Sequence, residues 1–196
     1  MKRMFDILFA MVMLLLFSPL FCGLAIWVSL DSRGGVFFGQ ERVGLDGKPF
    51  KLWKFRTMKP HAERGGQLTV GSSDSRITRA GYFLRKFKVD ELPQLWNVVL
   101  GDMSVVGPRP EVPRYVAMYS TEQRKVLSIR PGITDYASLR YFEESDLLAK
   151  SANPEETYIT QIMPAKLALN LEYVSKHSFV GDVAIIVKTG LRILKA

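Results

Sequence analysis

The segment FDILFAMVMLLLFSPLFCGLAIWVSL, from Phe5 to Leu30, is a long apolar run with one charge, Asp6, at its edge. It is long enough to cross a bilayer as a helix. A cleaved signal peptide fits poorly, because the run is too long and no small-x-small cleavage site follows it. A lipoprotein site at Cys22 also fits poorly, because the bulky Phe21 precedes it. Two interpretations remain, a straight transmembrane helix and a helix that enters the membrane and turns back.

Two features favour the helix that turns back. Ser18 and Pro19 lie near the middle of the run, and a proline there removes a backbone donor and kinks the helix. Basic residues flank the run on both sides, and the positive-inside rule then favours a cytoplasmic location for both flanks, which a single crossing cannot provide. From the residues alone both arrangements stay open. The flanking basic residues are Lys2 and Arg3 before the run and Arg33, Arg42, Lys48, Lys51, Lys54, Arg56 and Lys59 after it.

The composition narrows the range of partners and cofactors. A formal net charge of +8 suits an anionic partner such as acidic lipid, a phosphorylated substrate or nucleic acid. The single cysteine excludes a disulfide framework within the chain, and the distant His61 and His177 argue against a zinc site. A metal, if one is used, should be a hard cation held by oxygen atoms.

Patterns after residue 32 predict a mostly helical α+β fold with one small β-hairpin. VFFGQERV and FKLWKFRTM, residues 36–43 and 50–58, flank Asp46-Gly47, which is typical of a tight hairpin turn. Lys54 and Arg56 are two residues apart and therefore share one face of the second strand, where a solvated basic face is the common outcome. Residues 61–75 are polar and rich in glycine and serine, which predicts a loop.

Apolar residues at helical spacing predict helices in most of the remaining chain. Residues 75–88 form a basic amphipathic segment, and residues 120–123 offer a capping box between Ser120 and Gln123. In the last third, Asn153 is expected to cap a helix that Pro164 breaks into two pieces. The final segment, residues 178–196, fits either a helix in the membrane interface or a core helix with a basic outer face.

The stretch KVDELPQLWNVVLGDMSVVGPRPE, residues 88–111, carries the candidate chemistry. A helix is expected from Asp90, which falls near its N-cap, and aspartate is a favoured cap. A cap explains Asp90 but does not explain Glu91 beside it. Arg109 lies between two prolines, so its backbone is stiff and extended. A guanidinium on such a backbone suits bidentate binding of phosphate.

These groups suit phosphate chemistry. A carboxylate is already ionised at neutral pH and can attack phosphorus directly to form an acyl-phosphate. Mg²⁺ and basic side chains would offset the repulsion from an anionic substrate. Asp90, Glu91 and Arg109 supply these parts, with Lys54 and Arg85 as further candidates. Two alternatives stay open: a membrane-anchored basic protein that binds nucleic acid or acidic lipid without catalysis, and a Mg²⁺-dependent hydrolase of lipid phosphates or pyrophosphates.

The chain resembles the bacterial sugar transferases, the small monotopic phosphoglycosyl transferases that initiate glycan assembly. The resemblance covers nearly the whole chain and rests on KRMFD, the Ser18-Pro19 pair, GQERVGLDGKPFKLWKFRTM, RKFKVDELPQLWNVVLGDMSVVGPRPE and IRPGIT. It implies a re-entrant membrane hairpin over residues 1–32, broken at Ser18-Pro19. It also implies a cytosolic catalytic domain with interfacial helices over residues 33–196. Both termini would lie on the cytoplasmic face of the bacterial inner membrane.

The resemblance also implies a reaction. A sugar-1-phosphate would move from a UDP-sugar to a polyprenyl phosphate such as undecaprenyl phosphate, in the first membrane step of polysaccharide assembly. UMP would be released, and the route would be ping-pong through a phosphosugar on Asp90. Asp90 and Glu91 would form the catalytic dyad and hold Mg²⁺. Basic residues would contact phosphate or nucleotide: Lys54, Arg85, Arg109 and, as the weakest assignment, Arg130.

The partners implied are a UDP-sugar, a polyprenyl phosphate and membrane lipid, and not nucleic acid. The residues do not fix the oligomeric state, and a homodimer is one arrangement that they allow. One segment departs from the family pattern: after RPGIT the chain reads DYASLRYFEESDLL, residues 135–148. We expect this segment to influence which sugar or nucleotide is selected.

Overall fold

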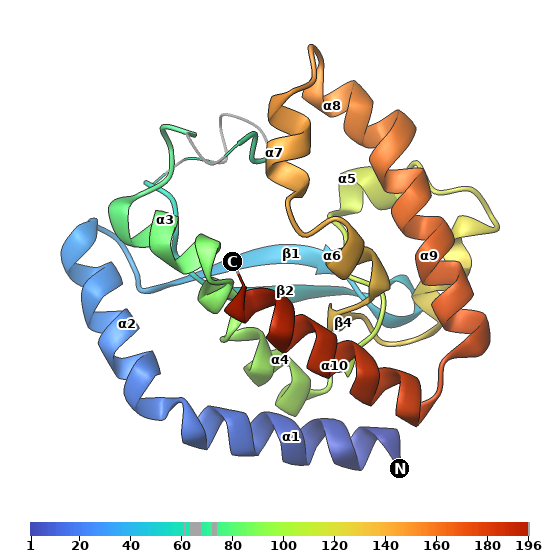
Figure 1. Ribbon diagram of the computed structural model, residues 1–196, viewed down its shortest axis with the longest axis horizontal. Helices are drawn as coiled ribbons and strands as arrows, with labels where there is room; N and C mark the ends of the chain where they lie inside the picture. Colours follow the sequence, from blue (N-terminus) through green and yellow to red (C-terminus); the bar gives the residue numbers. More distant parts are fainter. Residues whose placement is uncertain (61, 63–67, 72–73, 196) are drawn as a thin grey trace.

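The computed structural model describes residues 1–60, 62, 68–71 and 74–195. The predicted loop of residues 61–75 falls largely outside these ranges, as does His61. The described part of the chain is mostly helical with small sheets, as predicted, but it has a second two-stranded sheet besides the predicted hairpin. Figure 1 shows a β-hairpin at the centre, with one long helix along the bottom of the view and another crossing in front.

The N-terminal apolar run forms two helices, α1 (Lys2–Leu16) and α2 (Ser18–Asp31), bent by 64° at Phe17. In a continuous helix the carbonyl of Leu15 would accept from the amide of residue 19, but Pro19 has no amide hydrogen. The Ser18 hydroxyl donates to this carbonyl at 2.8 Å instead. No single helix among the described residues is long and apolar enough to cross a membrane, whereas this bent pair passes that test together. The predicted break at Ser18-Pro19 is confirmed.

The N-terminal end of α1 is tied to the rest of the fold by buried polar groups. Asp6 is 2% exposed and accepts from the Ser104 hydroxyl at 2.8 Å and from the Val105 amide at 3.2 Å. Lys2 Nζ lies 2.6 Å from Asp182 Oδ2 on the C-terminal helix.

The side of the α1–α2 pair that faces away from the rest of the fold is exposed. Its exposed apolar residues are Met4, Leu8, Met11, Val12, Leu15, Leu16, Leu20, Ile26, Trp27 and Leu30.

The predicted hairpin is confirmed. Strands β1 (Phe37–Val43) and β2 (Pro49–Phe55) pair antiparallel, with Val43 opposite Pro49 next to the turn. In the turn Asp46 and Gly47 have positive φ angles of 55° and 76°. Aspartate tolerates this left-handed conformation and glycine adopts it without steric cost, which is why the pair is a strong hairpin signal.

The helix predicted to start at Asp90 starts later. Helix α3 (Arg79–Lys86) is followed by Lys88 with a φ of 55° and by a 3₁₀ turn, Val89–Glu91. Helix α4 runs from Gln94 to Leu100, with Pro93 as its N-cap. The left-handed Lys88 redirects the chain, so Asp90 sits in the 3₁₀ turn and makes no capping hydrogen bond. The capping interpretation of Asp90 is therefore wrong.

The middle of the chain adds a second sheet in which β3 (Ser104–Val106) and β4 (Gly132–Thr134) are parallel. A Cβ atom on Gly132 would lie 2.1 Å from the Gly107 nitrogen, so the two loops meet this closely only with glycine at this position. The predicted capping box lies in the chain between β3 and β4. The Ser120 amide donates to Gln123 Oε1 at 2.9 Å, and the Gln123 amide donates to Ser120 Oγ at 3.2 Å. The short helices here are α5 (Pro113–Val116), a 3₁₀ segment (Gln123–Ser128), α6 (Tyr136–Arg140) and α7 (Glu144–Ala149).

The predicted break at Pro164 is absent. Helix α8 (Pro154–Thr157), capped by Asn153 as expected, continues through a π-helical turn (Tyr158–Ile162) into α9 (Met163–Lys176). Figure 1 shows α8 and α9 as one rod. Proline lacks an amide hydrogen and its ring crowds the carbonyl four residues earlier, and the wider π turn relieves this conflict without ending the helix.

Helix α10 (Phe179–Leu194) closes the fold beside α1. It buries Asp182 and Ile185 but leaves much of its apolar surface uncovered, which favours the interfacial interpretation over that of a core helix. Its exposed apolar residues are Phe179, Val180, Val183, Val187, Leu191 and Leu194.

Candidate active site

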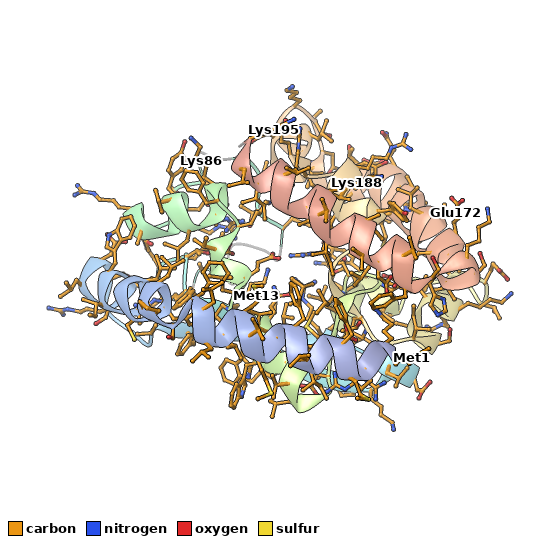
Figure 2. The ribbon with its side chains drawn as sticks, turned by 60° about the horizontal axis from the view of Figure 1, so that its bottom comes forward. Met1, Met13, Lys86, Glu172, Lys188 and Lys195 are labelled. Atoms are coloured by element: carbon orange, nitrogen blue, oxygen red, sulfur yellow. The ribbon has the colours of Figure 1, made fainter. Side chains whose placement is uncertain are left out.

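A cavity of about 1090 Å³ lies between the N-terminal helix pair and the C-terminal helices. Figure 2 shows α1, with Met1 and Met13, in front and α10, with Lys188 and Lys195, across from it. The cavity wall is apolar near these helices, with Phe9, Met13, Phe17 and Leu20 on one side and Ile186 and Ile193 on the other. Five predicted site residues line the same cavity: Lys54, Arg85, Asp90, Glu91 and Arg109.

Asp90 is the unpaired member of the two adjacent carboxylates. Its side chain is buried, with the residue 8% exposed, and Oδ1 has no hydrogen-bond partner among the described residues. Burial, together with the neighbouring negative charge of Glu91, raises the pKa of Asp90. A buried carboxylate oxygen without a partner is costly unless a ligand or substrate supplies the missing contact.

Glu91 is paired on both oxygens. Lys54 Nζ on β2 lies 3.0 Å from Oε1, Arg109 Nη1 lies 3.0 Å from Oε2, and Arg109 Nη2 also contacts Oε1. Burial alone would raise the pKa of Glu91, but Arg109 and Lys54 outweigh it and hold this pKa well below its usual range. Glu91 is therefore an ionised anchor, whereas Asp90 keeps a free oxygen.

Asn97 on α4 sets the position of this pair relative to β2. It is fully buried, its Oδ1 accepts from the Trp53 amide at 3.0 Å, and its Nδ2 donates to the Lys51 carbonyl at 2.8 Å. These bonds fix α4 against β2, so that Lys54, the residue after Trp53, faces Glu91. We did not predict this role for Asn97. Its signal in the sequence is an amide side chain within the apolar stripe of a helix.

Asp135 fixes the backbone of Arg109. It is fully buried, its Oδ2 accepts from the Arg109 amide at 3.1 Å, and its Oδ1 accepts from the Ser138 amide at 2.5 Å as the N-cap of α6. The pKa of Arg109 is raised, because the attraction of Glu91 outweighs the effect of burial. Asp135 opens the segment predicted to influence selectivity, and we did not expect it to hold the loop that carries Arg109.

The remaining basic candidates occupy different places. Arg85, in the last turn of α3, lines the cavity, and burial lowers its pKa. Arg130 donates through Nε to the Gly101 carbonyl at 3.0 Å, at the other end of α4 from Asp90. The structure does not bring Arg130 to the cavity, and its role stays a prediction.

Lys54 and Arg56 do not form the solvated basic face that is the common outcome for such a pair. Arg56 is 8% exposed and donates to the Ser32 carbonyl at 2.6 Å.

The residues present fit a magnesium ion held mainly through Asp90. No cluster of three or more His, Cys, Asp or Glu side chains with metal-binding geometry forms in the part of the chain that the structure describes. Mg²⁺ does not require one, because it commonly takes one or two carboxylates together with substrate phosphates and water. Asp90 Oδ1 is free for this purpose, whereas both oxygens of Glu91 already accept from Lys54 and Arg109.

A free buried carboxylate, an ionised partner held by two cations, and a cavity that reaches a bent apolar helix pair are features that suit the class of proteins that act on phosphate groups. Comparison with known proteins agrees with this class. The whole chain, residues 1–196, matches the family described as bacterial sugar transferase, and the chain belongs to that family.

Curated relatives align with most of the chain. It is 37% identical to the UDP-glucose:undecaprenyl-phosphate glucose-1-phosphate transferase of Escherichia coli (strain K12), over 96% of this chain and 39% of that protein. It is 36% identical to the UDP-N-acetylgalactosamine-undecaprenyl-phosphate N-acetylgalactosaminephosphotransferase of Aeromonas hydrophila, over 96% and 42%. The exopolysaccharide production protein ExoY of Rhizobium meliloti (strain 1021) is 36% identical, over 96% and 83%. The chain thus spans about two fifths of the length of the first two relatives.

Proposed function

We propose that the protein transfers a sugar-1-phosphate from a UDP-sugar to a polyprenyl phosphate at the membrane surface, and thereby initiates polysaccharide assembly. The observation that carries this proposal is the free buried oxygen of Asp90 beside a Glu91 that two cations hold in place. The family membership and the activities for which the relatives are named supply the substrate classes.

Asp90 is the proposed nucleophile. Its carboxylate oxygen attacks the phosphorus that carries the sugar, the bond from this phosphorus to the bridging oxygen breaks, and UMP leaves with that oxygen. A phosphate oxygen of the polyprenyl phosphate then attacks the same phosphorus. The acyl-phosphate bond breaks, Asp90 is restored as a carboxylate, and the product is a polyprenyl diphosphate sugar. No general base is needed, because the lipid phosphate is anionic and the nearby cations Lys54, Arg85 and Lys88 favour the carboxylate form of Asp90 against the effect of burial.

The basic residues bind and orient the diphosphate in this proposal. The positively charged side chains of Arg109 and Lys54 line the cavity. Their contacts with Glu91 fix them in place before the substrate binds. Arg85 reaches the same cavity from α3. Mg²⁺, held through Asp90 with Glu91 beside it, would supply the remaining charge that offsets repulsion between a carboxylate and a diphosphate.

The uncovered apolar surfaces support the proposed location at the membrane. The bent α1–α2 pair would form the re-entrant hairpin of residues 1–32, with both of its ends on the cytoplasmic face and residues 33–196 as the catalytic domain. Trp96 and Leu100 on α4 are exposed, as are the apolar residues of α10, and these helices flank the cavity. A site at this surface would receive a soluble donor from one side and the phosphate of a lipid from the other.

Release of UMP by purified protein in detergent tests this function. The assay contains Mg²⁺, a panel of UDP-sugars and a polyprenyl phosphate. We expect repeated turnover of UMP from one or a few donors only when the lipid is present, because without the lipid the first half-reaction releases at most one UMP per protein molecule. Asp90→Asn should abolish this release without loss of fold. Asp46→Asn, in the exposed hairpin turn where asparagine is also tolerated, should leave it unchanged.

Two outcomes would contradict the proposal. Release of many UMP molecules per protein molecule without the lipid, with water as acceptor, would indicate a hydrolase instead. Folded wild-type protein that releases no UMP with any donor and forms no phosphosugar adduct on Asp90 by mass spectrometry would leave a basic binding protein as the better interpretation.

A further inference from the structure

A second group of charged residues holds the loop that carries Arg109. Arg42 on β1 donates through Nη1 to the Pro110 carbonyl at 2.9 Å and to Glu111 Oε1 at 3.0 Å. Its Nε and Nη2 donate to Gln40 Oε1 at 3.2 and 2.8 Å. The Arg42 and Glu111 side chains are only 17% and 15% exposed. All three nitrogens of the Arg42 guanidinium thus donate hydrogen bonds, which fix its position.

Glu111 is bound at each of its oxygens. Its main-chain carbonyl accepts from the Val43 amide at 2.9 Å, and Oε1 also accepts from the Val112 amide at 2.7 Å. Oε2 accepts from the hydroxyl of Tyr158, which is 3% exposed and packs against Tyr115 with ring centroids 5.0 Å apart. Tyr158 is the first residue of the π-helical turn between α8 and α9. Such turns are frequent at functional sites.

These contacts act on one side of Arg109 and Asp135 acts on the other. The Arg109 amide is held by Asp135, and the carbonyl of the next residue, Pro110, is held by Arg42. The flanking prolines restrict the loop but do not choose the orientation of its peptide planes. The direction in which the guanidinium of Arg109 leaves the loop therefore depends on both anchors.

We propose that Arg42, Glu111 and Tyr158 form a positioning network that aims Arg109 at Glu91 and at the diphosphate of the donor. The inference rests on the proposed function insofar as Arg109 binds phosphate there. A buried ion pair adds little net stability compared with apolar residues, but removal of one partner is costly, so such a pair is better suited to fixing a geometry than to stabilising a fold. Through Tyr158 the network links the α8–α9 helix to the phosphate-binding loop.

Binding of UDP, measured by calorimetry in detergent, tests the network in a double-mutant cycle. Glu111→Gln should weaken binding of UDP by about tenfold in the wild-type background, since Arg109 loses its orientation. The same change should have an effect of less than about twofold in an Arg109→Ala background, because the group being positioned is gone. Tyr158→Phe, which removes only the hydroxyl, should follow the same pattern if Glu111→Gln does not fold.

Glu155→Gln is the matched control. Glu155 pairs with Arg114 at 2.5 Å between α8 and α5, but both side chains are about half exposed, at 44% and 53%. Loss of this ion pair should leave binding of UDP unchanged in both backgrounds. An effect of Glu111→Gln or Tyr158→Phe that is equally large with and without Arg109 would overturn the inference, since it would show direct substrate contact or a general structural role.

The binding cycle is independent of turnover, so the two proposals fail separately. Wild-type protein that binds UDP, shows the coupling and releases no UMP would contradict the proposed function and support the network. Wild-type protein that releases UMP but shows no coupling between Glu111 and Arg109 in the binding cycle would support the proposed function and contradict the network. Wild-type protein that does not bind UDP would overturn the inference.

Discussion

Glu91 and Arg109 face each other as a bidentate pair, with Nη1 3.0 Å from Oε2 and Nη2 in contact with Oε1. Asp90, the preceding residue in the chain, has a buried Oδ1 without a hydrogen-bond partner among the described residues. Two adjacent carboxylates thus have opposite environments. The different pKa shifts follow from this, upward for Asp90 and downward for Glu91, and they agree with the proposed roles of Glu91 as an anchor and Asp90 as the nucleophile.

Arg109→Lys should lower kcat/KM for UMP release by roughly 10- to 100-fold, because an ammonium group cannot bind both oxygens of Glu91 and a phosphate with the planar geometry of a guanidinium. Steady-state kinetics with the preferred donor measures this. Arg124→Lys, at an exposed position in the 3₁₀ segment Gln123–Ser128, is the control and should stay within experimental error. Equal rates for Arg109→Lys and wild type would contradict the bidentate role.

Asn97→Ala should destabilise the fold by about 2–4 kcal/mol, because the fully buried Asn97 side chain bonds both the Trp53 amide and the Lys51 carbonyl. The thermal unfolding midpoint in detergent checks this. Asn153→Ala removes an exposed helix cap and should cost only about 1 kcal/mol. A smaller shift for Asn97→Ala than for Asn153→Ala would show that α4 is not held to β2 through this side chain.

The parts of the fold that the sequence predicted follow local rules. Pro19 breaks the apolar run because of its own missing amide, and Asp46-Gly47 turns the hairpin because of its own backbone preferences. The start of α4 was misplaced because it depends on the left-handed Lys88, a residue type without such a preference. Pro164 was expected to break its helix, but a π turn accommodates it, and the turn is not visible in a pattern of apolar residues.

The candidate site shows the same division. The sequence predicted a cluster of Asp90, Glu91, Lys54 and Arg109, because residue types alone reveal a charge imbalance that suits phosphate. It did not reveal that both carboxylate oxygens of Glu91 are paired with Lys54 and Arg109 while Asp90 Oδ1 has no partner among the described residues. Nor did it reveal the supports Asn97 and Asp135, because both act through hydrogen bonds to backbone that is distant in sequence.

Removal of divalent cations should stop UMP release, and Mg²⁺ should restore it. The reason is the free Asp90 oxygen, which suits one ligand position of a hard cation that shares its other positions with substrate phosphates and water. Treatment with EDTA followed by titration of Mg²⁺ measures this dependence. A second readout is the thermal unfolding midpoint with UDP present, which Mg²⁺ should raise in wild-type protein more than in Asp90→Asn. Full activity in excess EDTA would contradict a magnesium role.

Replacing both Ser18 and Pro19 by alanine should straighten the α1–α2 pair, because Leu15 regains an amide partner at position 19 and the kink loses its cause. A continuous helix over residues 2–31 exceeds the roughly 20 residues that span a bilayer, so an N-terminal epitope tag should move to the opposite side of the membrane. Protease protection of the tag in inverted membrane vesicles detects this change. Pro49→Ala, at the exposed start of β2, should leave the tag where it is in the wild type.

Glu144→Gln should change the preference among UDP-sugars. Glu144 on α7 lies 2.6 Å from Lys166 on α9, and both side chains line the cavity. Glu144 also belongs to the segment of residues 135–148 that we expect to influence the choice of sugar or nucleotide. A partly buried charged pair in the same cavity as Arg109 offers a donor and an acceptor to sugar hydroxyls. Its disruption should therefore alter the ratio of kcat/KM for two donors by about tenfold, rather than lowering both values equally. Glu143→Gln breaks an exposed pair with Arg192, at 3.0 Å, and should leave this ratio unchanged. Equal losses for every donor in Glu144→Gln would place the pair in general support of the site instead of in sugar selection.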